Sequence, residues 1–413
     1  MNVAGDGVPV LRQTFAEENV CLAYYFMKCY NQYVQWIQTT AAEANMEGKI
    51  KKIVITGGPC GGKSTAMSRM QSYFTELGYR VLFVSETATE LIKGGVAHWT
   101  CGSNKAYQTC QIRLQMEKEK IFENAALSMP DEKILIVCDR GTIDNKAYMA
   151  PDEFAEVMRD IGTNEVELRD TYDGVFHLVT AAKGAAEFYT TSNNSARTET
   201  PKQAALIDDK IISAWTGHPH LRVIDNSEDF DGKMKKLLQE ITGFLGEPEP
   251  YETERKFLIE YPDIDLLRSL DNCQRVEIIQ TYLNSPDGEE VRVRQRGIEG
   301  SYIYFKTIKR RISGMKCVEI EDRLSKDEYL ALLMNADTSK RQIRKDRYCL
   351  TYKNQYFEID VYPFWKDKAI AEIELSGEDD DIVFPDYIKI IKEVTEDLSY
   401  KNSSLAKLVS DGG

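Results

Sequence analysis

Charged and apolar residues alternate between Tyr251 and Leu375, through one predicted strand after another. In a β-strand, residues two positions apart face the same side of the sheet, so each run places its charges on one face. Because both signs recur at the same phase, we expect several antiparallel strands to direct cations and carboxylates into one ionic lumen, most simply a short closed barrel. The alternating charged residues are Glu252, Glu254 and Lys256; Arg292, Arg294 and Arg296; Glu319 and Glu321; Lys345 and Arg347; Glu358 and Asp360; and Glu372 and Glu374.

Such a lumen would suit a polyanion together with a divalent metal ion. Lys and Arg side chains grip phosphate oxygens through charge-assisted hydrogen bonds, and carboxylates are hard oxygen ligands for Mg²⁺ or Mn²⁺. The alternative interpretation is a sheet whose charged face lies in water, although solvated faces rarely segregate the sign of charge by strand.

The same residues carry a family likeness. Glu252-Thr253-Glu254-Arg255-Lys256 resembles the ExExK signature of the CYTH domains, which are also called triphosphate tunnel metalloenzymes. Later segments are similar to further family motifs, in the family's order: Arg292-Val293-Arg294, Lys306, Lys345-Asp346-Arg347, Glu372-Ile373-Glu374 and the tail from Glu393 through Ala406. The resemblance implies an eight-stranded antiparallel tunnel barrel with flanking helices.

It also implies a division of roles among the charged residues. The cations expected to grip a triphosphate are Lys256, Arg292, Arg294, Lys306, Lys345 and Arg347, and Lys256 is in addition a catalytic candidate. The carboxylates expected to hold Mg²⁺ or Mn²⁺ are Glu252, Glu254, Glu319, Glu321, Glu358, Asp360, Glu372 and Glu374.

A second motif lies upstream. Residues 51–56 read as a buried strand that leads into a GxxxxGK[ST] loop and then a helical pattern ending near Gly78. Glycines let backbone N–H groups turn onto phosphates, and the helix N-terminus adds its positive dipole end. We expect Lys63 to reach the β- and γ-phosphates of a nucleotide and Ser64 to bind Mg²⁺. The nucleotide-binding candidates in this loop are Gly57, Gly58, Pro59, Cys60, Gly61, Gly62, Lys63, Ser64 and Thr65.

Further apolar runs at 80–84, 134–139, 175–179 and 221–224 alternate with helical segments, which predicts a parallel three-layer α/β domain. The third strand of the chain ends in Asp139, which we interpret as the Walker B carboxylate near Mg²⁺. The alternative is an Asp that caps the following helix. The fold class is therefore α/β plus β-barrel.

Three other side chains are candidates for this nucleotide site. Glu86 follows the second strand, where α/β folds bind ligands, and is a candidate for holding a substrate or a metal-bound water; a plain surface Glu is the alternative. Arg140 follows Asp139 and is placed to contact phosphate. Arg197 lies in a polar stretch that resembles a mobile lid, from which an Arg stabilises transferring phosphoryl charge, unless it is an ordinary loop Arg.

This half is similar to the AAA_28 family of P-loop proteins, through its P-loop, Asp139-Arg140-Gly141 and the run from Gly217 to Leu221. His218 and His220 in that run read as structural residues, because no carboxylate or Cys lies near them in the sequence. The expected domains are a helical extension at 1–49, a P-loop domain at 50–246, a linker at 247–250 and a CYTH domain at 251–413.

The bulk properties exclude some classes. The net charge of −14 argues against general nucleic-acid binding, which needs a basic surface. The nine Cys are scattered and show no CxxC or Cys/His metal spacing, which favours a reduced setting. No signal peptide or spanning segment is visible, so we expect a cytoplasmic protein, with peripheral membrane association left open.

The two halves together resemble the TRPL translocation defect protein-like family. That likeness implies a GTP-binding regulatory protein in membrane-protein trafficking, whose tunnel binds phosphoinositide or phosphatidic acid headgroups or polyphosphate. The NKxD pattern of regulatory GTPases is absent, so the residues leave GTP or ATP open. One alternative is a metal-dependent triphosphatase acting on tripolyphosphate, thiamine triphosphate or a nucleoside triphosphate. Another is a small-molecule kinase in which Glu86 orients the acceptor hydroxyl.

Overall fold

The computed structural model describes residues 50–131, 133–185, 200–247, 251–285, 289–313, 316–375 and 381–407, with backbone alone at 251–253, 311–313 and 316–318. Residues from Lys51 onward form one compact unit that contains two sheets. The helices expected within residues 1–49 lie outside the described residues. In the part of the chain that is described, no helix combines the length and apolar character needed to cross a membrane.

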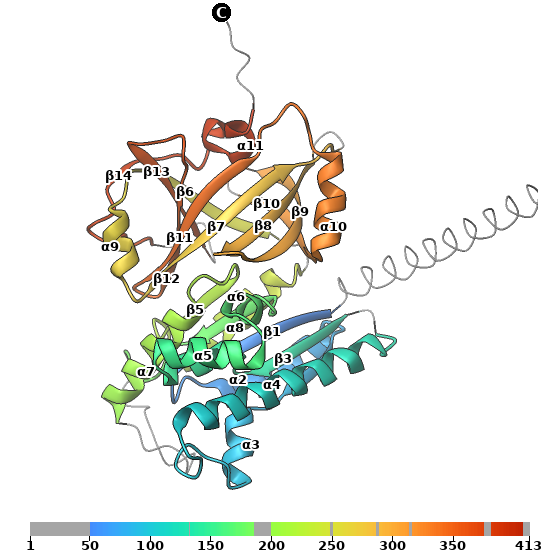
Figure 1. Cartoon of the computed structure of the whole chain (residues 1–413), viewed down its shortest axis with the longest axis vertical. Coiled ribbons are helices and arrows are strands. Elements are labelled where there is room, and N and C mark those ends of the chain that lie inside the picture. The colour runs from blue at the N-terminus through green and yellow to red at the C-terminus, as the bar shows by residue number, and fades with distance from the viewer. Residues whose placement is uncertain are drawn as a thin grey trace, which may run out of the picture. The chain divides into compact units, whose positions relative to one another are not determined.

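The first sheet is parallel and carries the P-loop (Figure 1). Its five strands lie in the order β2-β3-β1-β4-β5, so the P-loop strand occupies the centre. The apolar runs of the sequence therefore form the strands predicted for a three-layer α/β domain. Their bounds are β1 Ile50–Thr56, β2 Arg80–Val84, β3 Ile134–Asp139, β4 Gly174–Leu178 and β5 Leu221–Ile224.

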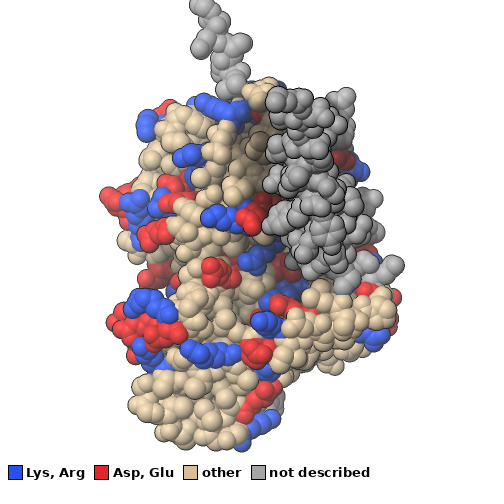
Figure 2. Space-filling view, turned by 45° about the vertical axis from the view of Figure 1, so that its right-hand side comes forward, with Lys and Arg blue, Asp and Glu red and all other residues tan. Residues whose placement is uncertain are grey.

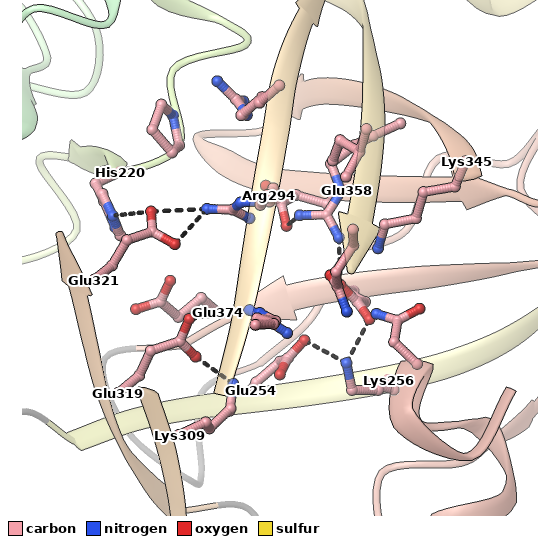
Figure 3. A pocket seen from close by; sticks show the side chains of 18 of the residues that line it. His220, Glu254, Lys256, Arg294, Lys309, Glu319, Glu321, Lys345, Glu358 and Glu374 are labelled. Carbon is pink, nitrogen blue, oxygen red and sulfur yellow. Dashed lines mark hydrogen bonds and ion pairs between the residues drawn. The ribbon is translucent and has the colours of Figure 1, made fainter. Parts of the chain in front are cut away.

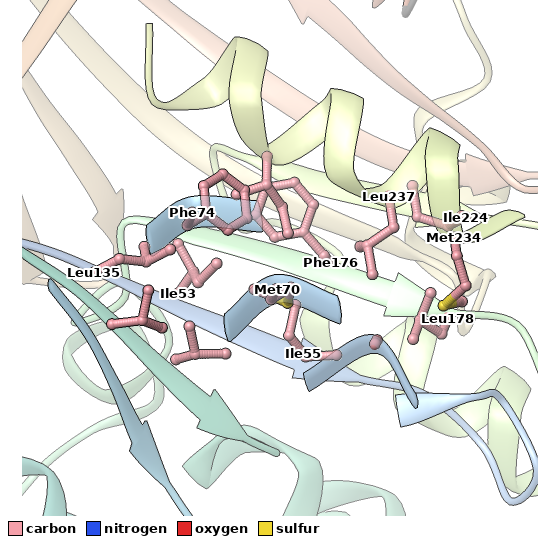
Figure 4. Packing of buried hydrophobic residues seen from close by; sticks show 14 of the residues in the cluster. Ile53, Ile55, Met70, Phe74, Leu135, Phe176, Leu178, Ile224, Met234 and Leu237 are labelled. Carbon is pink, nitrogen blue, oxygen red and sulfur yellow. The ribbon is translucent and has the colours of Figure 1, made fainter. Parts of the chain in front are cut away.

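Helices connect these strands and cover the sheet. On one face, α2 and α8 press Met70, Phe74 and Leu237 against Ile53 and Phe176 of the strands, and all five side chains are fully buried (Figure 4). Burial of each such side chain stabilises the fold by about 1.5–3 kcal/mol. The helices of this domain are α2 Lys63–Glu76, α3 Thr87–Lys93, α4 Asn104–Leu127, η1 Thr142–Tyr148, α5 Pro151–Ile161, α6 Glu165–Arg169, α7 Pro201–Trp215 and α8 Phe230–Phe244.

The second sheet is antiparallel and has nine strands, one more than the eight expected. The order is β10-β9-β8-β7-β11-β12-β13-β6-β14, and β10 also pairs with β6 at 316–318 and 251–253. The extra strand, β14, pairs with β6 beyond that stretch. The bounds are β6 Tyr251–Glu260, β7 Cys273–Tyr282, β8 Glu290–Ile298, β9 Ser301–Ser313, β10 Lys316–Leu324, β11 Ile343–Tyr352, β12 Gln355–Val361, β13 Lys368–Glu374 and β14 Ile390–Glu393.

The apolar residues of this sheet pack outward, and the charged residues between them face the interior. Ile359, Ala371 and Ile373 belong to a cluster that includes Leu267 of α9 (Ile264–Ser269). A second outer cluster joins β8 and β9 to Tyr329 of α10 (Lys326–Leu332). The remaining short helices are η3 Leu333–Asn335, η4 Leu398–Tyr400 and α11 Asn402–Leu405.

Apolar side chains also fill one end of the barrel interior. Leu258, Ile370 and Tyr282 lie on the same strand faces as the charged lumen residues, and they pack with Val394 and Ala406. Helix α11 lies over this end (Figure 1). The ionic pocket runs from this end, where Asn402 of α11 lines it, to the side where the parallel-sheet domain contributes His220 and Arg222.

The junction with that domain is polar and buried. Arg296 of β8 pairs with Asp170 at 3.2 Å, and Asp170 in turn pairs with Arg169 at 2.7 Å. All three residues are almost fully buried. Although burial opposes ionisation, Arg169 and Arg296 lower the pKa of Asp170. Removing one partner of such a buried pair costs about 3–5 kcal/mol, so this cluster fixes the junction.

His218 lies in the same junction as a neutral ring. Its Nδ1 accepts a hydrogen bond from the His220 backbone N–H at 3.0 Å, and its Nε2 lies 3.0 Å from the Tyr172 carbonyl. Burial lowers its pKa to about 3, against a smaller opposing effect of Asp170. The structure thus gives His218 the structural role expected for it.

We predict that His218→Gln removes part of the acid sensitivity of the fold. Because the pKa of His218 is lowered in the folded state, the unfolded chain takes up a proton first, and stability is lost as the pH falls below about 6.5. The wild-type free energy of unfolding should fall between pH 6 and pH 4 by about 1.4 kcal/mol per pH unit more than that of the variant. Urea unfolding over this range is the measurement, and parallel curves for the two proteins would contradict the prediction.

Candidate functional site

The interior of the antiparallel sheet contains a pocket with charged walls (Figure 3). Its side chains come from the strands of the second sheet and from one segment of the P-loop domain. The lining residues are Pro219, His220, Arg222, Glu254, Lys256, Ile278, Gln280, Arg292, Arg294, Arg296, Lys309, Glu319, Glu321, Lys345, Arg347, Tyr356, Glu358, Glu372, Glu374 and Asn402. The alternating charges therefore converge on one space, as their spacing predicts.

One wall of the pocket is built by β8, β9 and β10. Arg292 donates to Glu319 at 3.1 Å, and Arg294 donates to Glu321 at 2.7 Å. Lys309 pairs with the same Glu319. Despite burial, Arg294 lowers the pKa of Glu321 to about 2. Glu321 is therefore ionised, and both carboxylates hold the guanidinium groups in place.

The facing wall is built by β6, β11, β12 and β13. Lys256 donates to Glu254 at 2.7 Å and also pairs with Glu372. Arg347 donates to Glu372 at 2.7 Å and makes two further bonds, each 2.7 Å long, to Asp360. Burial disfavours the charge of Glu372, yet Lys256, Lys345 and Arg347 hold its pKa well below the usual range.

Two further contacts complete this wall. Glu358 pairs with Arg347, and Asp360 pairs with Lys345 behind the pocket surface. Asp360 does not line the pocket and is fully buried, so it acts as a fixed counter-charge beneath the two cations.

Positive charge exceeds negative charge among the described residues that line the pocket. Eight Lys and Arg side chains face six Glu side chains there, while Asp360, Asp170 and Glu240 pair with some of these cations from outside the pocket lining. The Nε atoms of Arg292 and Arg294 are buried and have no hydrogen-bond partner. Because buried donors are nearly always paired, these two are suited to an anionic ligand.

The strand register corrects the expectation for Lys306. Arg292 and Arg294 stand opposite Thr307 and Phe305, so those positions of β9 share the lumen face. Lys306 stands opposite Val293, which packs in the outer cluster, and it does not line the pocket. Lys309 lines the pocket instead. Alternation along β9 places Lys306 and Lys309 on opposite faces, and the pairing with β8 decides which of them faces inward.

The metal site expected in the lumen is incomplete in the part of the chain that is described. Glu254 and Glu374 are register partners on neighbouring strands, which places two candidate ligands side by side. No group of three or more His, Cys, Asp or Glu side chains suited to a metal ion occurs among the described residues. The side chain of Glu252, a third candidate, lies outside them. We therefore derive no reaction step through a lumen metal.

The pocket also contains residues that sequence reasoning missed. His220 lies 3.9 Å from Glu321 (Figure 3), and Arg222 of β5 pairs with Glu374. Both belong to the P-loop domain, and no local pattern in the sequence connects them with strands more than thirty residues further on. Arg296, at the junction end of the lumen, is a further charged residue that was not assigned a ligand role in advance.

The P-loop lies between β1 and α2. A Cβ at Gly57 would come within 2.1 Å of the Leu178 carbonyl oxygen, and the φ of 142° also demands glycine. The Gly58 N–H donates to buried Asp208 of α7 at 2.8 Å, which anchors the loop. Gly62 caps α2 without a side-chain bond, so the first N–H groups of the helix are left for a ligand.

Four residues predicted for the nucleotide site lie close together at this loop: Lys63, Asp139, Arg140 and Glu86. Lys63 is buried, and its Nζ lies 3.4 Å from the Gly57 carbonyl oxygen. Burial, followed by the charge of Arg140, lowers its pKa to about 8. Asp139 has a raised pKa through burial, and its Oδ1 is buried without a partner. That unpaired oxygen, beside Lys63, fits the polar shell of Mg²⁺.

Glu86 is ion-paired rather than poised as a base. Arg140 donates to it at 2.7 Å, and Thr89 donates to it at 2.6 Å. Although burial opposes ionisation, Arg140 and Lys63 lower its pKa to about 2. A carboxylate this acidic is a weak base near neutrality, so its contacts favour the positioning of Arg140.

Among the remaining candidates, some belong to the described part of the chain and one does not. Ser64 and Thr65 are exposed in the first turn of α2, and the Nη1 of Arg140 is buried without a hydrogen-bond partner. Arg197 lies outside the described residues.

The chain is similar to known families over both halves. The AAA_28 family, described as an AAA domain, matches residues 52–233, and the CYTH domain family matches residues 250–408. The inorganic triphosphatase of Nitrosomonas europaea is 35% identical over 159 residues, which are 38% of this chain and 96% of that protein.

Solved structures match over a similar share of the chain. A crystal structure of an inorganic triphosphatase is 31% identical, covering 38% of this chain and 95% of that one, with a TM-score of 0.27. A protein of Pyrococcus horikoshii is 19% identical over 30% of this chain and 80% of that one, with a TM-score of 0.25. With a relative 35% identical and covered almost end to end, the chain belongs to the CYTH domain family and carries an AAA_28 domain ahead of its CYTH domain.

Proposed function

We propose that the CYTH tunnel of this chain binds and hydrolyses an inorganic or organic triphosphate. The observation that carries the proposal is the excess of lumen cations together with the unpaired, buried Nε atoms of Arg292 and Arg294. A linear triphosphate supplies acceptor oxygens along its whole length. It would therefore satisfy these donors and balance the positive charge.

The residues divide the work between the two walls. Arg292 and Arg294 grip phosphate oxygens from one side, while Lys256 and Arg347 do so from the other. Their carboxylate partners keep these cations in fixed orientations before the ligand arrives, which reduces the ordering cost of binding. A divalent metal ion, where one is bound, polarises phosphoryl oxygens and activates water.

The name of the similar protein favours the triphosphatase hypothesis over the regulatory hypothesis. The name of the Nitrosomonas europaea protein is inorganic triphosphatase, and its likeness lies in the half of the chain that builds the lumen. The trafficking and phospholipid-binding roles rest on resemblance alone. We therefore rank the triphosphatase first.

We predict that the full chain binds tripolyphosphate and that Arg294→Ala weakens this binding about 10- to 100-fold, the effect of one lost charge-assisted contact. Calorimetric titration gives the affinity, and phosphate release with Mg²⁺ or Mn²⁺ gives the activity. Repeating both in a Lys63→Ala background removes any contribution of the P-loop.

Arg275→Ala is the matched control. Arg275 is also a strand arginine with an unpaired Nε, but it pairs with Glu277 and Asp346 and does not line the pocket. Equal losses in the two variants, or a wild-type chain that neither binds nor cleaves tripolyphosphate, would rule out the proposed site.

We propose in addition that the P-loop domain binds a nucleoside triphosphate with Mg²⁺. The supporting observation is that two buried atoms near Lys63, Asp139 Oδ1 and Arg140 Nη1, have no hydrogen-bond partner, although Arg140 Nη1 lies 3.9 Å from Asp144. Ser64 and Asp139 would hold the metal ion, and the backbone of residues 57–62 would cradle the phosphates. GTP and ATP are both candidates.

We predict that Lys63→Ala lowers the affinity for GTP or ATP by about 10- to 100-fold, because an ammonium–phosphate contact is lost. Arg294→Ala should leave nucleotide affinity unchanged, which separates the P-loop from the lumen. Titration with each nucleotide tests this, and the same affinity in Lys63→Ala as in the wild type would show that the P-loop does not carry the binding.

The regulatory hypothesis and the kinase hypothesis are tested with the same protein. Binding to vesicles that contain phosphatidic acid or a phosphoinositide, without turnover of tripolyphosphate, would restore the regulator to first place. Transfer of phosphate from ATP to a small hydroxyl compound would support the kinase, in which Glu86 lies beside the nucleotide site. The P-loop and lumen variants assign either result to one domain.

A further inference from the structure

The P-loop domain contributes side chains to the lumen of the CYTH domain. Arg222 of β5 reaches the pocket and pairs with Glu374 of β13. Its Nε also lies 3.6 Å from Glu240 of α8, so the guanidinium sits between a carboxylate of each domain. The side chain is 18% exposed, which leaves it accessible from the pocket.

The segment that carries Arg222 is firmly attached to the barrel. The Tyr356 hydroxyl donates to the His218 carbonyl at 3.0 Å, and Arg296 donates to the Gly217 carbonyl. Within the P-loop domain, the ring of His220 packs edge-on against Phe244, with centroids 5.4 Å apart. The position of Arg222 at the lumen is therefore set by buried contacts on both sides of the junction.

The Arg222 guanidinium can also bind a phosphate group in the lumen. Glu374 lies opposite Glu254 in the strand register. The positive charge of Arg222 therefore offsets the repulsion between these two carboxylates. A guanidinium presents five donors in a planar fork and binds phosphate in the same geometry as carboxylate. A phosphate group that enters the lumen can therefore share or take the donors that Glu374 holds.

We propose that Arg222 is a phosphate-binding residue of the tunnel, so that the triphosphate site of this chain is built from both domains. The proposal rests on the proposed function of the lumen. The Nitrosomonas europaea relative is covered over 96% of its length by a match of 159 residues, which leaves no room for a second domain of this size. The composite site therefore distinguishes this two-domain chain from that relative.

The test compares Arg222→Gln with Arg323→Gln in the full chain. Arg323 crosses the same junction, where its Nη1 donates to the Asp170 carbonyl at 2.9 Å, but it does not line the pocket. Calorimetric titration with tripolyphosphate in buffer with a metal chelator measures binding alone. We expect Arg222→Gln to weaken affinity about tenfold or more, and Arg323→Gln to stay within about twofold of the wild type.

Each outcome has one meaning. A selective loss in Arg222→Gln, with a higher KM for hydrolysis and a smaller change in kcat, supports the composite site. Unchanged affinity in Arg222→Gln overturns it while leaving the proposed function intact. Equal losses in both variants also overturn it, because a loosened junction then explains the effect. A wild-type chain that neither binds tripolyphosphate nor releases phosphate from it with Mg²⁺ or Mn²⁺ overturns the proposed function and the composite site together.

Discussion

The burial of opposite charges inside one antiparallel sheet is the constraint on which the rest of this structure depends. Moving a charge from water into a protein interior costs several kcal/mol even after relaxation, and only well-formed pairs offset that cost. Arg347 meets this demand with three carboxylates, and Lys256 meets it with two. A lone strand could form only the Lys256–Glu254 pair, because every other partner lies on a different strand, so the ionic network and the closing of the sheet depend on each other.

The same network prepares the lumen for a ligand. Carboxylates hold the guanidinium groups in position, and two buried Nε atoms are left without partners. A polyanion completes these bonds without much reordering of side chains. The protein carries a net charge of −14, and Lys and Arg are interspersed with Asp and Glu on the face shown in Figure 2, so the attraction for phosphate that we propose is local to this lumen and to the P-loop rather than a property of the whole surface.

The junction between the two domains follows from the same physics. Arg296 belongs to the alternating series of β8, yet its counter-charge, Asp170, comes from the P-loop domain. An ion pair of this kind is specific in direction, so it fixes how the end of the barrel meets the loop that carries His218 and His220. Arg222 then extends the P-loop domain into the lumen, and the two phosphate sites that we propose lie in domains that share a buried, charged interface.

Local patterns in the sequence determined much of this protein. Alternation by itself placed Arg292, Arg294, Lys345 and Arg347 on one strand face, because side chains in a strand repeat every two residues. The glycine-rich loop between a strand and a helix likewise specified the P-loop. Tertiary structure decided what such patterns do not contain. The pairing of β9 with β8 turned Lys306 outward and Lys309 inward, β14 added a ninth strand, and Arg222 reached the lumen from a distant segment. Register and contacts between domains arise from packing through space, which short-range periodicity does not encode.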